Sequence, residues 1–136
     1  MKGCYILLIE LKENKNIQVG KLGKFIFKKG FYVYIGSALN GLEHRIKRHF
    51  RKNKKKHWHI DYFLEYGEII DVFYEENEKK EECNIANKFG EKLNFFLKFG
   101  CSDCKCRSHF FFGDINKIKN VLTDLNASKF NIDANT

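Results

Sequence analysis

The sequence contains no proline, so it has no rigid spacer of the kind that separates domains. It also has no run of 18 apolar residues, which excludes an ordinary membrane-spanning helix. The short apolar stretch after Met1 lacks a small-residue cleavage site and alternates like a strand, so we do not interpret it as a signal peptide. The chain has five cysteines, an odd number, and no recognisable secretion signal. We therefore expect reduced thiols and a cytoplasmic protein.

The residues that are present predict one well-packed domain. With 136 residues, of which 43% are hydrophobic, the chain is long enough for a single core but not for two. We expect residues 1–125 to form this domain and the polar residues 126–136 to be a flexible tail. The net charge of +8 predicts attraction to a polyanion, either nucleic acid or an anionic membrane surface. Charge alone does not separate these two partners.

Short apolar segments separated by turn residues predict an antiparallel sheet built from hairpins. Strands are predicted over residues 4–11, 17–19, 25–27, 31–35, 69–74 and 108–112. Helices are predicted after an N-cap at Asn40, with Glu43 completing a capping box, and over residues 57–66, 81–97 and 115–125. The fold class is therefore α/β of the α+β type, with a small antiparallel or mixed sheet flanked by helices.

Two tyrosines stand beside glycines near strand ends, in Gly3-Cys4-Tyr5 and Tyr34-Ile35-Gly36, and the helix that follows carries Arg45 and His49. A phenol that activates water and cations that hold a phosphate suit hydrolysis of a phosphodiester. A tyrosine has an unperturbed pKa of about 10, so such a role requires nearby positive charge. Taken alone, Tyr34 is better interpreted as a core or edge aromatic residue.

The segment between Glu43 and Lys56 contains eight arginine and lysine residues. Such a run is most often a solvated helix face. Here, however, Arg45 and His49 fall at the edge of the buried stripe of the helix, where packing can hold a phosphate-binding group in place. Arg45 can also offer a planar fork to two phosphate oxygens. Further contacts to nucleic acid are predicted from Arg48, Arg51, Lys52, Lys54, Lys55 and His59.

Glu82 projects into the apolar stripe of the predicted helix 81–97, where a carboxylate without a partner is costly. One explanation is that it lies in the first turn, beyond the core, where the helix dipole favours a negative charge. The other is that it faces a cleft and binds one Mg²⁺ or Mn²⁺ ion, which keeps much of its hydration.

Four separated signatures, spread over about residues 3–113, resemble those of the GIY-YIG nuclease superfamily, and in particular its uncharacterised prokaryotic branch, a domain sometimes fused to endonuclease III. The signatures are Phe31-Tyr32-Val33-Tyr34-Ile35-Gly36-Ser37-Ala38, His57-Trp58-His59-Ile60-Asp61-Tyr62, Glu82-Cys83-Asn84-Ile85-Ala86 and Ser102-Asp103-Cys104-Lys105-Cys106-Arg107-Ser108-His109. The resemblance implies a central antiparallel sheet, a hairpin inserted between Tyr5 and Tyr34, and metal-dependent hydrolysis of a phosphodiester.

The resemblance also implies roles for individual residues. Tyr34 or Tyr5 is expected to act as general base, and Arg45 to stabilise the charge that develops on phosphorus. Glu82 is expected to hold Mg²⁺ or Mn²⁺. His49, together with His59 or His57, would position water or phosphate. We therefore expect the two phenols, Arg45 and Glu82 to line one solvent-reachable pocket.

A second possible metal site lies in Cys101-x-x-Cys104-x-Cys106-x-x-His109, with Cys83 as an alternative ligand. Zinc sites usually draw on two separated pairs of ligands, and so compact a run closes poorly around one ion. We therefore favour packing thiols, or a loop-shaping role, over bound Zn²⁺.

The sequence thus predicts a cytoplasmic, metal-dependent endonuclease that acts on nucleic acid, with DNA the expected substrate, at no membrane. Because no separate DNA-binding domain is recognised in it, we consider a protein partner that supplies specificity. Two alternatives stay open: a noncatalytic nucleic-acid-binding module of the same fold and a zinc-stabilised interaction domain.

Overall fold

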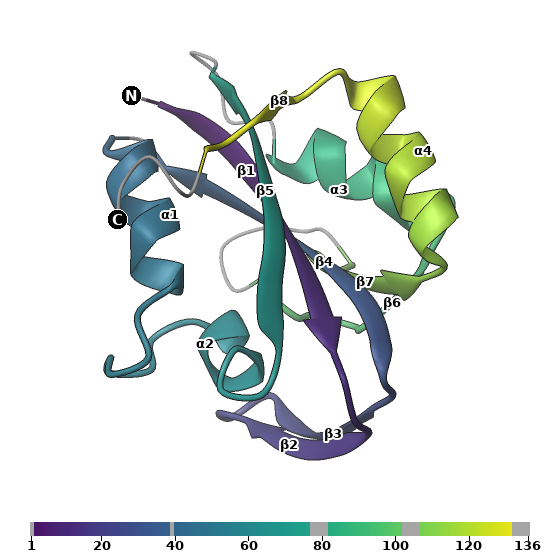
Figure 1. Ribbon diagram of the computed structural model, residues 1–136. Coiled ribbons are helices and arrows are strands. Elements are labelled where there is room, and N and C mark those ends of the chain that lie inside the picture. The colour runs from purple at the N-terminus through teal and green to yellow at the C-terminus, as the bar shows by residue number, and fades with distance from the viewer. Residues whose placement is uncertain (1, 39, 77–81, 102–106, 132–136) are drawn as a thin grey trace.

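The computed structural model describes residues 2–38, 40–76, 82–101 and 107–131, with the side chains of residues 82 and 83 left out (Figure 1). The described elements are β1 (Gly3–Leu11), β2 (Lys15–Val19), β3 (Gly23–Phe27), β4 (Gly30–Ala38), α1 (Leu42–His49), α2 (His59–Phe63), β5 (Glu68–Glu76), α3 (Glu82–Gly90), β6 (Asn94–Phe95), β7 (Phe110–Gly113), α4 (Ile115–Leu125) and β8 (Ser128–Lys129).

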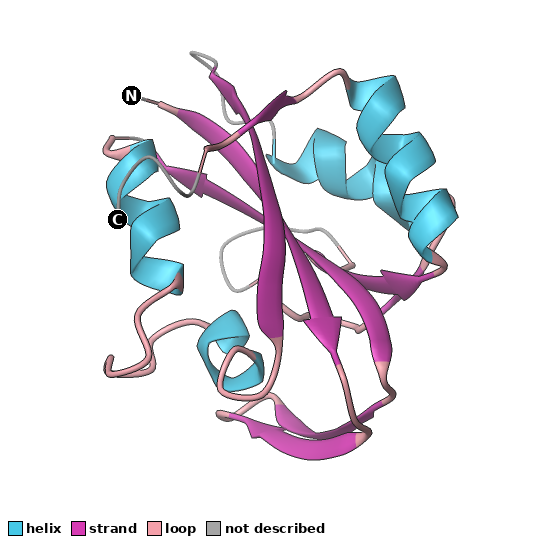
Figure 2. Cartoon of the chain, in the orientation of Figure 1, coloured by secondary structure: helices cyan, strands magenta, loops and turns pink. Residues whose placement is uncertain are grey.

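A six-stranded antiparallel sheet of order β6-β7-β4-β1-β5-β8 forms the centre of the molecule (Figure 2). Strand β1 pairs with β4 on one side and β5 on the other, and nearly all of its residues are buried. This central position accounts for its nearly unbroken apolar sequence, because a strand covered on both faces needs apolar side chains at almost every position. The predicted α+β class with an antiparallel sheet is likewise confirmed.

Alternate residues of β1 contribute to two separate apolar layers. Tyr5, Leu7 and Ile9 face the layer that also contains residues of α1 and α2. Cys4 and Ile6, in contrast, face the layer formed with α3 and α4. Figure 1 shows the two helix pairs on opposite sides of the sheet. Both tyrosines of the predicted site therefore point toward α1 and α2, away from the body of α3.

The hairpin β2–β3 is inserted between β1 and β4, as predicted, and forms a small sheet of its own. It closes one end of the first apolar layer through Phe25 and Phe27. The ring of Phe27 lies 5.0 Å from that of Phe63 in α2, and the ring of Phe25 lies 6.2 Å from that of Phe96. Aromatic contacts of this kind add to the stabilisation from area burial.

The start of α1 differs from the prediction. The helix begins at Leu42 and its N-cap is Gly41, which has a φ of 68° and no capping side chain. The predicted capping box of Asn40 and Glu43 is therefore wrong, because glycine alone adopts this left-handed entry at little cost. Glu43 instead pairs with Lys47 at 3.0 Å along the helix surface.

The second and third helices are shorter than predicted. Helix α2 covers only His59–Phe63, and α3 ends at Gly90 rather than near residue 97. After α3 the chain forms β6, which pairs with β7, and the ring of Phe96 lies 4.9 Å from that of Phe27. Long-range strand pairing and packing against the first apolar layer therefore override the helical spacing of residues 91–97.

The C-terminal residues are more ordered than predicted. Strand β8 pairs with β5, and the Phe130 amide donates a hydrogen bond to the Val72 carbonyl at 2.8 Å. The prediction of a flexible tail from residue 126 is therefore wrong for residues 128–130, while residues 132–136 lie outside the described part. None of the described helices has the length and apolar character that a bilayer crossing requires.

Replacing Phe130 with alanine tests whether this strand stabilises the domain. Its ring is partly buried and lies 6.0 Å from that of Tyr74. We expect Phe130→Ala to lower the free energy of unfolding by roughly 1–2 kcal/mol, as measured by urea denaturation. Ser128→Ala, at an exposed position, is the control and should change stability by less than about 0.5 kcal/mol. Equal stability of the two variants would mean that the tail contributes nothing.

Candidate active site

Tyr5 and Tyr34 come from the neighbouring strands β1 and β4, and their ring centroids lie 6.5 Å apart. Gly36 is the register partner of Tyr5. A Cβ atom at position 36 would lie 2.3 Å from Cζ of Tyr5, closer than any real contact. The glycine of Tyr34-Ile35-Gly36 is thus required because the Tyr5 ring covers its backbone.

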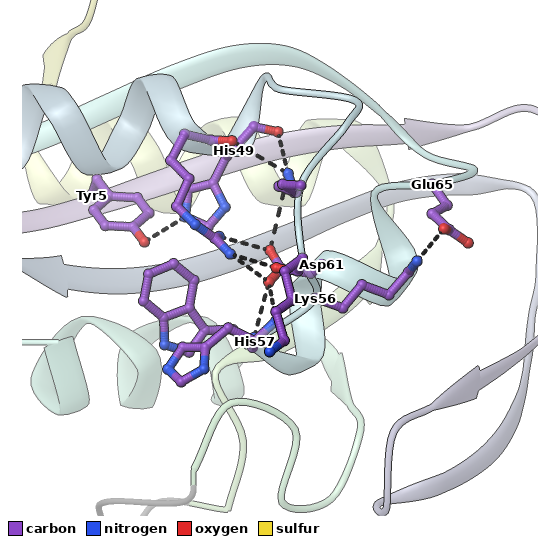
Figure 3. A network of polar contacts seen from close by, with 10 residues as sticks. Tyr5, His49, Lys56, His57, Asp61 and Glu65 are labelled. Carbon is purple, nitrogen blue, oxygen red and sulfur yellow. Dashed lines mark hydrogen bonds and ion pairs between the residues drawn. The ribbon is translucent and has the colours of Figure 1, made fainter.

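His49, at the end of α1, closes the same group of residues (Figure 3). The Tyr5 hydroxyl and His49 Nε2 share a hydrogen bond of 2.6 Å. The imidazole centroid lies 5.3 Å from the Tyr5 ring and 6.0 Å from the Tyr34 ring. The structure therefore brings together three of the four residues predicted to be catalytic.

His49 is only 3% exposed, and its environment determines its charge. Burial, and after it the positive charge of Lys54, lower its pKa from 6.5 to about 3, against the opposing effect of Asp61. The imidazole is therefore neutral near pH 7. Its Nδ1 atom is buried and makes no hydrogen bond to any described residue. A neutral, enclosed imidazole holds Tyr5 in place rather than presenting a cation to a phosphate.

Arg45, the fourth predicted catalytic residue, reaches back from α1 to the end of β4. Its Nη1 donates to the Ser37 carbonyl at 2.5 Å, and its guanidinium carbon lies 5.0 Å from the centroid of the Trp58 ring. The side chain is half-buried. Packing against the Trp58 ring and the bond to the Ser37 carbonyl thus hold the guanidinium in place. Ser37 lies three residues after Tyr34 in β4.

Asp61, for which the sequence predicted no role, forms a network of hydrogen bonds near this cluster (Figure 3). It is 1% exposed and accepts two hydrogen bonds from Arg48, at 3.0 and 3.1 Å. It also accepts from the amides of His57 and Trp58, at 2.7 and 2.9 Å. Burial alone would raise the pKa of Asp61, but these bonds outweigh it and hold the pKa below its usual value. The signal that could have revealed the role of Asp61 is its place in the third position of α2, where an acidic side chain can accept a hydrogen bond from the N-cap amide.

The residues predicted to bind nucleic acid separate into two groups. Arg48 is bonded to Asp61, and Lys54 donates to the His49 carbonyl at 2.9 Å, with a side chain only 10% exposed. These two cations are therefore occupied by internal bonds. Arg51, Lys52 and Lys55, in contrast, are exposed.

His59 has an internal partner as well. Its Nδ1 accepts a hydrogen bond of 2.8 Å from the Gly100 amide, and burial lowers its pKa. Gly100 has a φ of 76°, and a Cβ atom there would lie 3.2 Å from Cε1 of Tyr34. His59 thus holds the chain against the Tyr34 ring, whereas His57 is exposed.

The expectation of two phenols in a solvent-reachable pocket is wrong for Tyr5. Its ring is 2% exposed and lies inside the first apolar layer. Tyr34 belongs to the same layer and is 7% exposed. Both rings fill the space between the sheet and α1. They lie close together because both are packed in the core, and they do not line an open cavity.

The described part of the chain contains no group of three or more histidine, cysteine, aspartate or glutamate residues that could hold a metal ion. The buried carboxylate of Asp61 is bonded to Arg48 and two amides, which leaves it unsuited to a cation. The described residues therefore do not complete a Mg²⁺ or Mn²⁺ site. Glu82 begins α3, but its side chain lies outside the described part, so its role as a ligand stays a prediction.

The predicted zinc ligands are only partly described. Cys101 is 6% exposed and its thiol donates to the Phe99 carbonyl at 3.5 Å, while His109 is 2% exposed. Cys104 and Cys106, and the side chain of Cys83, lie outside the described part. Zinc binding by this segment stays a prediction.

Comparison with family models finds one described as "Domain of unknown function DUF123", which matches residues 4–130. Neither the curated proteins nor the solved structures yielded a match.

The contact between Tyr5 and Gly36 predicts that Gly36→Ala destabilises the protein. The added methyl group would overlap the Tyr5 ring and force it away from His49, at a cost of roughly 1–3 kcal/mol in the free energy of unfolding. Gly90→Ala is a matched control, because a Cβ atom there would lie at an ordinary 3.5 Å from the Phe111 ring. Urea denaturation of both variants measures the difference. A Gly36→Ala protein as stable as the control would contradict the close packing.

The lowered pKa of His49 predicts a specific loss of stability in acid. Unfolded His49 binds a proton near pH 6.5, but folded His49 binds it only near pH 3. The free energy of unfolding should therefore fall as the pH drops from 6.5 to 3, by at most about 1.4 kcal/mol per pH unit from this group. His49→Gln keeps a hydrogen-bonding group for Tyr5 but does not titrate. Its stability should fall less over this range, whereas parallel pH profiles would show that His49 is not the group responsible.

Proposed function

We propose that this chain, which belongs to the family described as domain of unknown function DUF123, is a metal-dependent endonuclease of the GIY-YIG type that hydrolyses phosphodiester bonds in nucleic acid. One observation carries the proposal. Tyr34 and His49 flank the buried Tyr5 ring, and Arg45, from the same helix as His49, is bonded to the Ser37 carbonyl, three residues after Tyr34. A phenol and a guanidinium so placed suit the chemistry of phosphate esters.

In this proposal Arg45 stabilises the negative charge that develops on the phosphate. Its bond to the Ser37 carbonyl uses one of the five N–H donors of a guanidinium and leaves others for phosphate oxygens. The Trp58 ring beneath it limits the motion of the side chain before substrate binds. A guanidinium that is already in position stabilises the transition state without a cost of reorganisation during the reaction.

Tyr34, in its phenolate form, accepts the proton of the attacking water and becomes the neutral phenol; it is the more exposed of the two tyrosines. Tyr5 has a positioning role, because its hydroxyl is bonded to His49 inside the apolar layer. That bond ties β1 to the end of α1 and so keeps Arg45, one helical turn earlier, close to the strand that carries Tyr34.

Glu82 would hold the Mg²⁺ or Mn²⁺ ion, which in this class of reaction neutralises charge on the leaving oxygen. DNA is the proposed substrate, and the excess of positive charge supports a polyanionic partner. We place the protein in the cytoplasm, with a protein partner as one source of specificity. The odd number of cysteines supports the first of these assignments.

One observation favours a second candidate, a noncatalytic module that binds nucleic acid. Both phenols are largely buried, which suits a structural role, while Arg51, Lys52 and Lys55 remain exposed for phosphate contacts. Such a module would keep the basic surface of the fold and cleave nothing.

Nicking of supercoiled plasmid with Mg²⁺ or Mn²⁺ distinguishes the two candidates. Tyr34→Phe removes one hydroxyl, and Arg45→Lys keeps the charge but loses the fork, so each should lower the nicking rate on the order of 100-fold. Glu82→Gln should lose the dependence on the metal ion. Tyr66→Phe, at an exposed tyrosine, is the control and should nick like the wild type. If the wild type nicks no faster than Tyr34→Phe, Arg45→Lys and Glu82→Gln while all variants stay folded, the nuclease is excluded and the binding module is the candidate that stays.

A further inference from the structure

The segment that joins α1 to α2, residues 50–58 and hereafter the basic arm, is held at both of its ends by internal bonds. Lys54 Nζ donates to the last carbonyls of α1, those of Arg48 and His49. Arg48 in turn donates to the Lys55 carbonyl at 3.1 Å. Cations at the C-terminal end of a helix satisfy carbonyls that have no partner in the helix and complement its dipole. The arm is therefore folded back on α1.

Asp61 holds the other end of the basic arm. It accepts the amides of His57 and Trp58 while it pairs with Arg48 on both of its oxygens. Lys54 lies 4.0 Å from it. The carboxylate lies close to both cations and offsets the repulsion between their like charges. One buried charge thus determines the path of the whole connection.

The side chains that project from the basic arm are cationic and exposed. Arg51, Lys52 and Lys55 point to solvent, and in the run from residue 51 to residue 57 no side chain is hydrophobic. A surface that binds lipid usually inserts apolar or aromatic side chains beside its cations. A segment that is rich in cations, lacks hydrophobic side chains and has a fixed backbone fits the regular phosphates of a nucleic acid better.

The base of the basic arm adjoins the candidate active site. The Trp58 ring lies 4.3 Å from the guanidinium carbon of Arg48 and 5.0 Å from that of Arg45. Trp58 therefore contacts both Arg48, which belongs to the hydrogen-bond network of the arm, and Arg45, which is proposed to bind the reacting phosphate. Nucleic acid bound along the arm would extend from this point.

We propose that the basic arm binds the sugar–phosphate backbone of nucleic acid to one side of the bond that is cleaved, and that Asp61 is the positioning residue that builds it. This inference rests on the proposed function for its substrate. Arg48 and Lys54 are internal parts of the arm, whereas Arg51, Lys52 and Lys55 make the phosphate contacts. The arm supplies affinity without sequence preference, since phosphates carry no sequence information.

Binding without cleavage tests the basic arm separately from catalysis. Fluorescence anisotropy of a labelled DNA duplex of about 20 base pairs, in EDTA and over a range of KCl concentrations, measures both affinity and its salt dependence. The arm variant replaces Arg51, Lys52 and Lys55 with glutamine. Its charge-matched control replaces the exposed lysines 88, 117 and 119 of α3 and α4, on the other side of the sheet, with the same residue.

The arm variant should bind at least about 10-fold more weakly. The negative slope of the logarithm of the association constant against the logarithm of salt concentration should decrease in magnitude by roughly 2–3, about 0.9 for each phosphate that is no longer neutralised. The control should keep most of the wild-type affinity and slope. Equal losses of affinity in both variants would mean that only net charge matters, and unchanged affinity in the arm variant would mean that the arm does not touch the duplex. Either result overturns the proposal, as does arm-dependent binding to anionic phospholipid vesicles that exceeds binding to the duplex.

Asp61→Asn gives a test in which net charge and positioning predict opposite results. The variant carries one more positive charge, so net charge alone predicts tighter DNA binding. The arm proposal predicts weaker binding, with Asp61→Glu recovering part of the loss because it restores the charge beside Arg48. Tighter binding by a folded Asp61→Asn protein overturns the positioning role, and if this variant does not fold the arm variant decides. Arm-dependent binding without any nicking would refute the nuclease and leave the arm in place.

Discussion

The buried ion pair between Asp61 and Arg48 is the interaction on which the rest of the site depends. It joins the last turn of α1 to the first turn of α2, and through the amides of His57 and Trp58 it directs the segment between them. Breaking such a pair by removing one partner typically costs about 3–5 kcal/mol, because the remaining charge stays buried. Here the loss of the ion pair would also release Trp58, whose ring packs against the guanidinium of Arg45. The structural role of Asp61 and the proposed chemical role of Arg45 are thus linked through one aromatic side chain.

The second constraint is the enclosed bond between Tyr5 and His49. Gly36 leaves room for the Tyr5 ring against the strand, and the ring in turn meets an imidazole that burial keeps neutral. The Tyr5 hydroxyl and His49 Nε2 therefore satisfy each other inside an apolar layer, whereas His49 Nδ1 has no hydrogen-bond partner among the described residues. This arrangement orders the end of α1 and keeps most of the site away from water. It accounts for the low exposure of both phenols. A hydrolytic mechanism has to operate with these buried rings, whereas a noncatalytic module needs them only for packing.

The elements that were predicted correctly are those whose patterns are local. The central strand β1, the inserted hairpin and α4 have regular apolar spacing, and each formed within a few residues of the predicted bounds. The errors lie where distant contacts compete with local pattern. Residues 91–97 continue a helical spacing, but β7 offers them backbone partners and the first apolar layer offers a place for Phe96. Likewise the polar residues after Asn126 give no sign of the edge of β5 with which they pair.

By itself, the sequence determined that the chain is strongly basic, that its fold is of the α+β class with an antiparallel sheet, and that Tyr5, Tyr34, Arg45 and His49 are worth examining together. Only the tertiary structure decided which charges face solvent and which face one another. Arg48 and Lys54 are indistinguishable from Arg51 and Lys55 in a run of cations, but a single carboxylate thirteen residues after Arg48 turns the first two inward. The physical reason is that a buried charge pairs with the groups that the fold brings within hydrogen-bonding distance. The local sequence does not show which groups those are.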